Sequence, residues 1–191
     1  MPYDAQRFLT LFVDASFCPR TLAAGWGAWA VRRSWGGGRF RSGPVSTSLE
    51  PAEAEIKGIA NALLIFHQEG ALNGIDQVMV QSDCARALQV LCHSAGAIQR
   101  AKEYKFDPIN RKLPTLGEML AVDRIVTLLE GRQLDVRHVY GHEGRSDGRR
   151  AVNTECDALA RREMQKMRGE MPGGKKMNRG ANRRLRWQER A

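Results

Sequence analysis

The hydrophobic positions near the N-terminus follow the period of two that is typical of β-strands. Residues 7–14 (RFLTLFVD) form an apolar run that ends in an acid, and residues 23–33 (AAGWGAWAVRR) alternate around two tryptophans. A glycine cluster at residues 36–38 separates the second run from a third, residues 39–48 (RFRSGPVSTS). Runs of this kind joined by glycine-rich turns favour hairpins, so the pattern predicts three consecutive antiparallel strands.

From Pro51 onward the hydrophobic period changes to that of a helix. Ile56, Ile59 and Leu63 recur at helical spacing, which predicts a helix over residues 52–68. Pro51, just before this range, suits a first helical turn. The same criteria predict a strand at 77–82, a helix at 85–98, a connection at 100–114, a helix at 116–129, a strand at 134–140, a glycine- and charge-rich loop at 141–150 and a helix at 152–167. The order βββαβααβα predicts an α/β fold in which helices pack on a mixed sheet.

Positive charge is concentrated at the C-terminal end of the chain. Residues 161–191 hold 11 of the 30 Lys and Arg residues but only three Glu, whereas the rest of the chain is almost neutral. This excess indicates a polyanionic partner, with nucleic acid ahead of an acidic membrane surface, unless the tail serves only solubility. We therefore expect one folded domain over residues 1–168 and a flexible basic tail over residues 169–191.

Composition narrows the cellular setting. No apolar run approaches the roughly 20 residues that a membrane span needs, and the N-terminus lacks the pattern of a secretory signal. The four cysteines lie far apart without a CxxC pair, which argues against a disulfide scaffold or a zinc ribbon. We expect a cytoplasmic protein that is not bound to a membrane.

Four acids stand out by their positions in the predicted elements. Asp14 ends the first apolar strand, where an acid is costly unless it is paired or metal-bound. Glu55 lies in the first helix, Asp83 directly follows the fourth strand, and Asp157 lies early in the last helix. Each of these three also has an ordinary explanation, as a helix cap, a partner of the helix dipole or a surface acid. Together, four carboxylates are sufficient to hold two Mg²⁺ ions about 3.5–4 Å apart for phosphodiester hydrolysis.

The motifs around these acids carry a family resemblance. The succession VDAS, AEIKGIANAL, SDCARAL and GHEG…NTECDALARR resembles type 1 ribonuclease H over about residues 7–165. The resemblance implies a five-stranded mixed sheet, three antiparallel strands followed by two parallel ones, with helices on both faces. It also implies an endonuclease that cleaves the RNA strand of RNA–DNA hybrids with two Mg²⁺ ions, for which Mn²⁺ can substitute, and leaves a 5′-phosphate and a 3′-hydroxyl.

The resemblance also implies roles for individual residues. Asp14 would bridge both metals, Asp157 would help hold the ion that activates water, and Glu55 and Asp83 would hold the ion at the leaving 3′ oxygen. His142 would assist proton transfer or product departure, although a solvent-exposed loop histidine is the alternative. Glu53 is a rival to Glu55 because it lies only two residues away.

Nucleic-acid contacts are expected from one residue of the first strand and from two basic segments. Ser16 follows Asp14 closely, and the basic residues lie in the 100–114 connection and in the tail. The predicted contacts are Ser16, Arg100, Lys102, Lys105, Lys175, Lys176, Arg183 and Arg184.

The sequence departs from the hybrid-specific pattern at two places. The family carries amides before the first helix and a Gln after the third acid, which contact the 2′-hydroxyls of RNA. Here residues 49–52 read LEPA, and Cys84 and Ala85 follow Asp83. A DNA- or junction-cutting nuclease on the same fold is therefore a second hypothesis, and a non-catalytic nucleic-acid-binding module is a third. We expect the protein to be a monomer.

The charge distribution leads to a prediction about the tail. Deleting residues 169–191 should raise KM for nucleic acid and flatten its salt dependence, because each phosphate neutralised contributes a slope of about −0.9 on B-form DNA. The turnover number should change little, since a flexible arm does not align reacting groups. Steady-state kinetics across a salt series measure both effects, and a collapse of kcat in a folded truncated protein would contradict the prediction.

Overall fold

The computed structural model describes residues 7–99, 113–139 and 148–169. The elements are β1 (Phe8–Cys18), β2 (Ala23–Arg32), β3 (Arg39–Val45), α1 (Pro51–Gln68), β4 (Gln77–Ser82), α2 (Ala85–Ser94), β5 (Ile98–Gln99), α3 (Leu116–Leu128), β6 (Gln133–His138) and α4 (Gly148–Met167). A short 3₁₀ turn (Arg33–Trp35) follows β2. Among the described helices, none combines the length and the apolar character that crossing a membrane requires.

The strands form one mixed sheet in the order β3-β2-β1-β4-β6-β5. β1 pairs with β2, and β2 with β3, in antiparallel fashion, whereas β4, β5 and β6 extend the sheet in parallel. The predicted mixed α/β sheet is confirmed, but the predicted count of five strands is wrong. The helix expected at 85–98 ends at Ser94, and Gly96 adopts a left-handed φ of 63° that turns the chain. The two residues of β5 then pair with β6 at the sheet edge.

β1 is longer than its hydrophobic pattern predicts. The apolar run ends at Asp14, but pairing with β2 continues through Ser16 to Cys18, opposite Ala23. Asp14 therefore lies inside a strand instead of at its end. The parallel pairing with β4 stops earlier, where Phe12 is opposite Gln81. Asp14 thus lies two residues beyond the last residue of β1 that pairs with β4.

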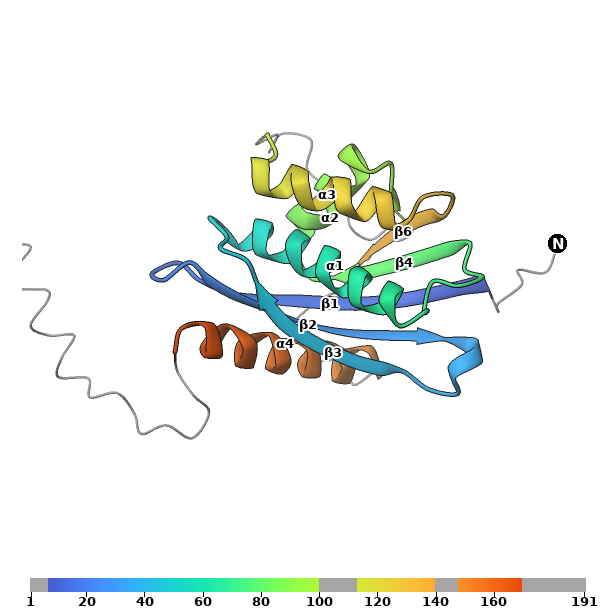
Figure 1. The fold of residues 1–191 in the computed structure, drawn as a ribbon, viewed down its shortest axis with the longest axis horizontal. Coiled ribbons are helices and arrows are strands. Elements are labelled where there is room, and N and C mark those ends of the chain that lie inside the picture. The colour runs from blue at the N-terminus through green and yellow to red at the C-terminus, as the bar shows by residue number, and fades with distance from the viewer. Residues whose placement is uncertain (1–6, 100–112, 140–147, 170–191) are drawn as a thin grey trace, which may run out of the picture.

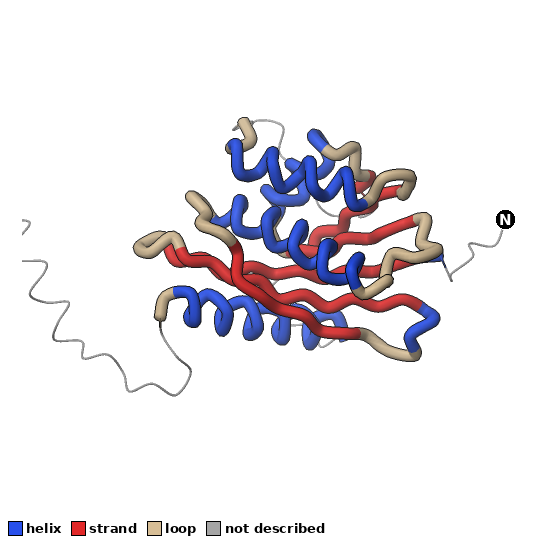
Figure 2. The backbone as a smooth tube through the Cα atoms, in the orientation of Figure 1, coloured by secondary structure: helices blue, strands red, loops and turns tan. Residues whose placement is uncertain are grey.

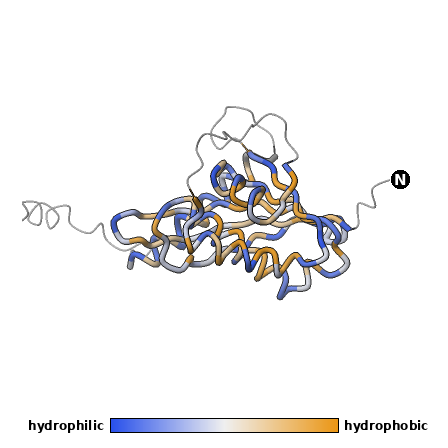
Figure 3. Tube along the Cα trace, turned by 90° about the horizontal axis from the view of Figure 1, so that it is seen from above, coloured by the Kyte–Doolittle hydropathy of each residue, from blue (hydrophilic) through white to orange (hydrophobic). Residues whose placement is uncertain are grey.

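Helices cover both faces of the sheet, as Figures 1 and 2 show, with α1 and α4 on opposite sides. Strand alternation sets this division because successive side chains point to opposite faces. Val13, Ala15 and Trp26 lie against Gly58 of α1, whereas Gly25 and Gly27 lie beneath α4. In Figure 3 hydrophobic positions run through the middle of the domain and hydrophilic ones mark its outer turns.

Two glycines allow α4 to lie directly on β2. A Cβ at Gly25 would come within 2.6 Å of the carbonyl oxygen of Ala160. A Cβ at Gly27 would overlap the carbonyl oxygen of Cys156 and lie 2.7 Å from Cβ of Leu159. Because Asp14 is the partner of Gly27 in β1, this close contact brings the middle of α4 close to the middle of β1. The spacing of two between the glycines places both on the same face of the strand.

This contact predicts that Gly27→Ala destabilises the domain. The added methyl group must push α4 away from the sheet, and overpacking of this kind costs about 1–3 kcal/mol. Urea denaturation should show the lower free energy of unfolding. Gly37→Ala is the matched control, because no atom lies within 4 Å of its added Cβ. Equal stability of the two variants would show that α4 does not depend on this close approach.

Candidate active site

Three of the four predicted acids meet at one place in the structure. Asp14 of β1, Glu55 of α1 and Asp83 after β4 each offer a carboxylate oxygen, and these oxygens all lie within 4.8 Å of one another. Up to 69 residues of sequence separate the three acids. They meet where β1 and β4 stop pairing, at the carboxyl ends of parallel strands, the edge at which open α/β sheets bind ligands.

Glu55 is the most enclosed of the three acids. Its side chain is buried, and the hydroxyl of Ser82 donates a hydrogen bond of 2.6 Å to its Oε1. The same hydroxyl accepts a bond of 3.0 Å from the backbone N–H of Cys84. Ser82 thus connects the acid of α1 to the turn that carries Asp83.

Asp83 lies in the short turn between β4 and α2. Two bonds from the end of β6 hold this turn: the backbone N–H of Val139 donates to the carbonyl of Ser82, and Nε2 of His138 donates to the carbonyl of Asp83, both at 3.0 Å. The acid itself is half-buried, so its carboxylate is open to solvent on one side.

Asp157 lies beside this group without being part of it. It occupies the third turn of α4, and Arg161 one turn later pairs with it at 2.8 Å. Asp157 is near enough to Asp14 for its charge to affect the titration of that acid. The structure therefore brings the fourth predicted acid to the same region, with an arginine as its present partner.

The electrostatics of the cluster are unfavourable for three negative charges. Burial, followed by repulsion from Asp83 and Asp157, raises the pKa of Asp14 to about 7. Burial, followed by repulsion from Asp14, raises the pKa of Glu55 well above its ordinary value, even though the Ser82 hydrogen bond acts in the opposite direction. Both shifts show that the described residues supply too little positive charge for all the carboxylates to be ionised at neutral pH.

A hard divalent cation would correct this imbalance. Carboxylate oxygens are the donors that Mg²⁺ and Mn²⁺ take in proteins, and Mg²⁺ needs only one or two of them because it keeps bound waters. The close spacing of the three oxygens and the unneutralised charge both fit such an ion. Asp14, Glu55 and Asp83 are the residues that would hold it, with Asp157 available at the side.

The two cysteines next to the acids do not suit a thiolate metal site. Burial and the neighbouring carboxylates raise the pKa of both Cys84 and Cys156 to about 12, so both thiols stay protonated at neutral pH. Cys156, a residue of α4, is fully buried, and Cys84 packs against the hydrophobic core. Both behave as small hydrophobic residues.

Glu53, the rival of Glu55, has a different environment. Its carboxylate pairs with Lys57 at 2.6 Å and accepts a hydrogen bond of 3.0 Å from the hydroxyl of Thr115, at the start of α3. It therefore joins α1 to α3 and is not part of the acid cluster.

The remaining predicted site residues divide between described and undescribed segments. Ser16 lies two residues after Asp14 on β1 and is half-buried, opposite Gly25 of β2. The others lie outside the described residues: His142, Arg100, Lys102, Lys105, Lys175, Lys176, Arg183 and Arg184.

Three residues around the site were not singled out from the sequence: Ser82, His138 and Arg161. Ser82 directly precedes Asp83, and Arg161 follows Asp157 by one helical turn, so both could have been found from their spacing. His138 lies 55 residues from Asp83, and no local pattern connects the two.

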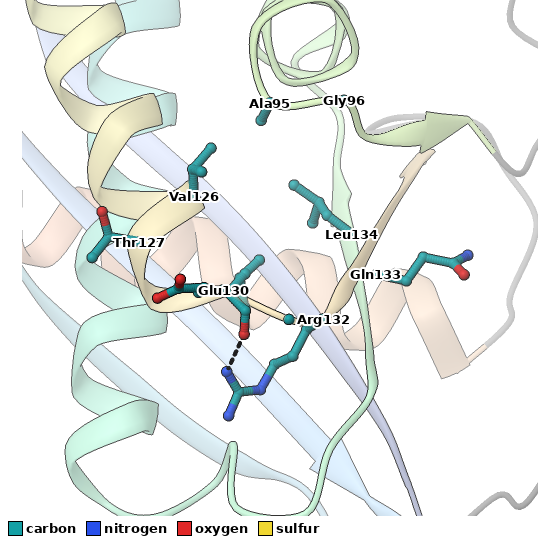
Figure 4. Close-up of a pocket in the computed structure, with 10 residues that line it drawn as sticks. Ala95, Gly96, Val126, Thr127, Glu130, Arg132, Gln133 and Leu134 are labelled. Carbon is teal, nitrogen blue, oxygen red and sulfur yellow. Dashed lines mark hydrogen bonds between the residues drawn. The ribbon is translucent and has the colours of Figure 1, made fainter.

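One hollow among the described residues lies elsewhere. It has a volume of about 560 Å³ and opens where β6 begins, between the ends of α2 and α3 (Figure 4). Arg132 there donates to the carbonyl of Glu130 at 3.1 Å. The acids lie near the opposite end of β6, so this hollow is separate from the candidate active site.

Fold and site together define an α/β protein with an acidic candidate active site, and comparison with known sequences gives the family. The chain matches RNase H over residues 6–165. It therefore belongs to the ribonuclease H family and is a ribonuclease H-type hydrolase. Comparison with curated proteins gave no match.

Solved structures share the fold at low sequence identity. RNase H1 from the halophilic archaeon Halobacterium salinarum NRC-1 is 17% identical with a TM-score of 0.54, covering 83% of this chain and 98% of that one. The N-terminal RNase H domain of a Mycobacterium tuberculosis protein is 16% identical with a TM-score of 0.56, covering 85% and 96%. LC11-RNase H1, solved in complex with an RNA/DNA hybrid, is 18% identical with a TM-score of 0.55, covering 83% and 97%.

The raised pKa of Asp14 predicts how stability depends on pH in chelator. The folded protein holds this proton up to about pH 7, whereas the unfolded chain releases it near pH 4. Stability should therefore fall as pH rises from 4 to 7. Asp14→Asn should remove its share of this loss and raise the free energy of unfolding at pH 8 by about 1–4 kcal/mol, with little gain at pH 4.

Urea denaturation with EDTA at the two pH values measures this difference. Asp123→Asn, which changes an exposed acid of α3, is the matched control and should have little effect. Added Mg²⁺ should stabilise the wild type at pH 8 and stabilise Asp14→Asn much less. An Asp14→Asn variant that is equally destabilised at both pH values would contradict the repulsion described here.

Proposed function

We propose that the protein is a metal-dependent endonuclease that hydrolyses the RNA strand of RNA–DNA hybrids and leaves a 5′-phosphate and a 3′-hydroxyl. The observation that carries the proposal is the meeting of Asp14, Glu55 and Asp83 within 4.8 Å in a chain of the ribonuclease H family. The fold shared with LC11-RNase H1, which was solved with an RNA/DNA hybrid, supports the choice of substrate.

The acids define the chemistry that this site favours. Two bound Mg²⁺ ions would activate the attacking water and neutralise charge on the phosphate and on the leaving 3′ oxygen. Asp14 would help to hold both ions, Glu55 and Asp83 would help to hold the ion that stabilises the leaving 3′ oxygen, and Asp157 the ion that activates water. Of the described groups beside the cluster, the thiols of Cys84 and Cys156 are protonated and so are not activated for attack on phosphorus, which favours direct attack by water.

Arg161, the ion-pair partner of Asp157, would contact the nucleic acid in this scheme. Its guanidinium pairs with Asp157, and its positive charge partly opposes the rise in the pKa of Asp14. The side chain is 60% exposed, so it can leave Asp157 when a cation takes its place. Its exposure at the margin of the cluster then suits contact with a phosphate of the bound strand.

The residues expected to contact the 2′-hydroxyls of RNA differ from the hybrid-specific pattern. Leu49, just before α1, is 70% exposed, and Cys84 and Ala85 follow Asp83 where 2′-hydroxyl-reading amides are expected. Recognition of RNA then depends on backbone groups and on residues such as Ser16, on the same strand as Asp14. A DNA- or junction-cutting activity on the same fold is the second candidate, favoured by this replacement of amides.

The proposal predicts the outcome of a cleavage assay on three matched substrates: an RNA–DNA hybrid, an RNA duplex and a DNA duplex, each with Mg²⁺. Cleavage should fall on the RNA strand of the hybrid, with end analysis showing 5′-phosphate. Asp14→Asn and Asp83→Asn should each lower kcat about a thousand-fold or more, because an amide is a poor Mg²⁺ ligand and several kcal/mol of charge stabilisation is lost.

The controls separate the two candidate functions from simple binding. Asp123→Asn should cleave like the wild type, and both inactive variants should still bind hybrid. Equal cutting of duplex DNA would favour the second function, and activity that persists in excess EDTA would exclude the metal-dependent mechanism. Binding of hybrid without cleavage by the wild type would instead favour a non-catalytic module.

We also propose that the protein acts as a cytoplasmic monomer with residues 1–168 as the catalytic domain and the basic tail as an accessory nucleic-acid contact. Its four free cysteines fit a reducing compartment. The charge of the tail suits a polyanion such as nucleic acid.

A further inference from the structure

Of the four acids at the candidate site, Asp83 is the one that regular secondary structure holds least. Asp14 lies within a strand, and Glu55 and Asp157 lie within helices, so backbone hydrogen bonds of regular elements fix all three. Asp83 comes after the last residue of β4 and before the first residue of α2. Its main chain needs other partners to stay in one conformation.

The end of β6 supplies these partners. His138 is opposite Ser82 in the parallel pairing of β4 and β6, which places its side chain on the same face as that of Ser82. The backbone N–H of Val139 extends the pairing to the carbonyl of Ser82. One residue further, the strand β4 has ended, and Nε2 of His138 reaches the carbonyl of Asp83 at 3.0 Å. The histidine side chain thus joins β6 to the chain after β4, at a point where the backbone pairing of the two strands has ended.

The chemistry of this bond defines the state of the ring. A carbonyl oxygen only accepts hydrogen bonds, so Nε2 must carry the proton that is donated. The peptide group of Asp83 is planar, and its carbonyl is joined to Cα by one rotatable bond. Fixing the oxygen therefore restricts ψ of Asp83, while the pairing at Ser82 restricts the preceding backbone. Together they limit the direction in which the Asp83 carboxylate points.

We propose that His138 is a positioning residue, whose Nε2–H holds the Asp83 carbonyl and thereby directs the Asp83 carboxylate toward the other two acids. This inference rests on the proposed function, in which Asp83 helps hold a divalent cation. His138 does not touch the substrate or the metal in this scheme. Its contribution is the preorganisation of one ligand, and outer partners of metal ligands typically affect metal affinity or activity about 10–100-fold.

The test compares replacements that differ in where they place a donor. Gln carries its amide nitrogen at nearly the distance of Nε2, whereas Asn is one bond shorter and Leu fills space without a donor. The variants are His138→Leu, His138→Asn and His138→Gln in the full chain. His93→Leu, at an exposed histidine of the last turn of α2, is the matched control.

Two measurements are made on each variant. Calorimetric titration of Mn²⁺ into the nucleic-acid-free protein reports ligand geometry without turnover, and steady-state kinetics on hybrid with Mg²⁺ separate kcat from KM. For His138→Leu and His138→Asn we expect Mn²⁺ affinity and kcat to fall by about tenfold or more, with KM for hybrid nearly unchanged. His138→Gln should recover most of both, and His93→Leu should match the wild type.

The outcomes distinguish positioning from packing and from substrate binding. If His138→Leu lowers the melting temperature strongly, the contrast between Asn and Gln still decides, because both are polar and of similar shape. Equal behaviour of Asn and Gln, or wild-type Mn²⁺ affinity and kcat in His138→Leu, would overturn the proposal. A rise in KM with unchanged Mn²⁺ affinity would also overturn it and would make His138 a substrate contact.

The same experiment separates this inference from the proposed function. If the wild type binds Mn²⁺ but does not cleave hybrid, the proposed function fails while the Mn²⁺ series still tests His138. If the wild type cleaves hybrid and the His138 series shows no difference, only the positioning role fails.

Discussion

Repulsion between carboxylates is the constraint around which this domain is built. Asp14, Glu55 and Asp83 lie within 4.8 Å of one another and are partly or fully removed from water. Burial and like charge both disfavour ionisation, which is why the pKa of Asp14 rises to about 7. The surrounding structure must hold together an arrangement that is unfavourable by itself, and a bound cation would relieve the repulsion.

The scaffold holds each acid in a different way. Asp14 belongs to the antiparallel ladder of β1 and β2, just beyond the end of the pairing with β4. Glu55 comes from a helix on one face and Asp157 from a helix on the other, and the latter reaches the sheet because Gly25 and Gly27 carry no side chain. Asp83 depends on the contact between the ends of β4 and β6. The site therefore lies where both helical layers and two parallel strands meet, so that stability of the domain and geometry of the site depend on the same contacts.

Periodicity predicted most elements but not their ends. The extent of β1 was underestimated because its last four residues are held by pairing with β2, a long-range interaction that the apolar run does not reveal. β5 was missed because two residues at a sheet edge carry no pattern. Glu53 and Glu55 illustrate the same limit at the site. Residues two apart on a helix do not face each other, so one acid contacts α3 and the other the sheet, yet the sequence alone left both as candidates.

The amino-acid sequence alone was enough to predict the order of the elements, the mixed character of the sheet and the four acids with their surrounding motifs. These features follow from local spacing, which the chain carries from one residue to the next. Three contacts were found only in the folded structure: Ser82 donates a hydrogen bond to Glu55, Arg161 forms an ion pair with Asp157, and His138 donates a hydrogen bond to the carbonyl of Asp83. The Ser82 and His138 contacts bridge 27 and 55 residues of chain, and the Arg161 pair depends on which way two long side chains turn. Contacts of this kind are set by strand register and helix packing, which are properties of the assembled core and not of any local segment.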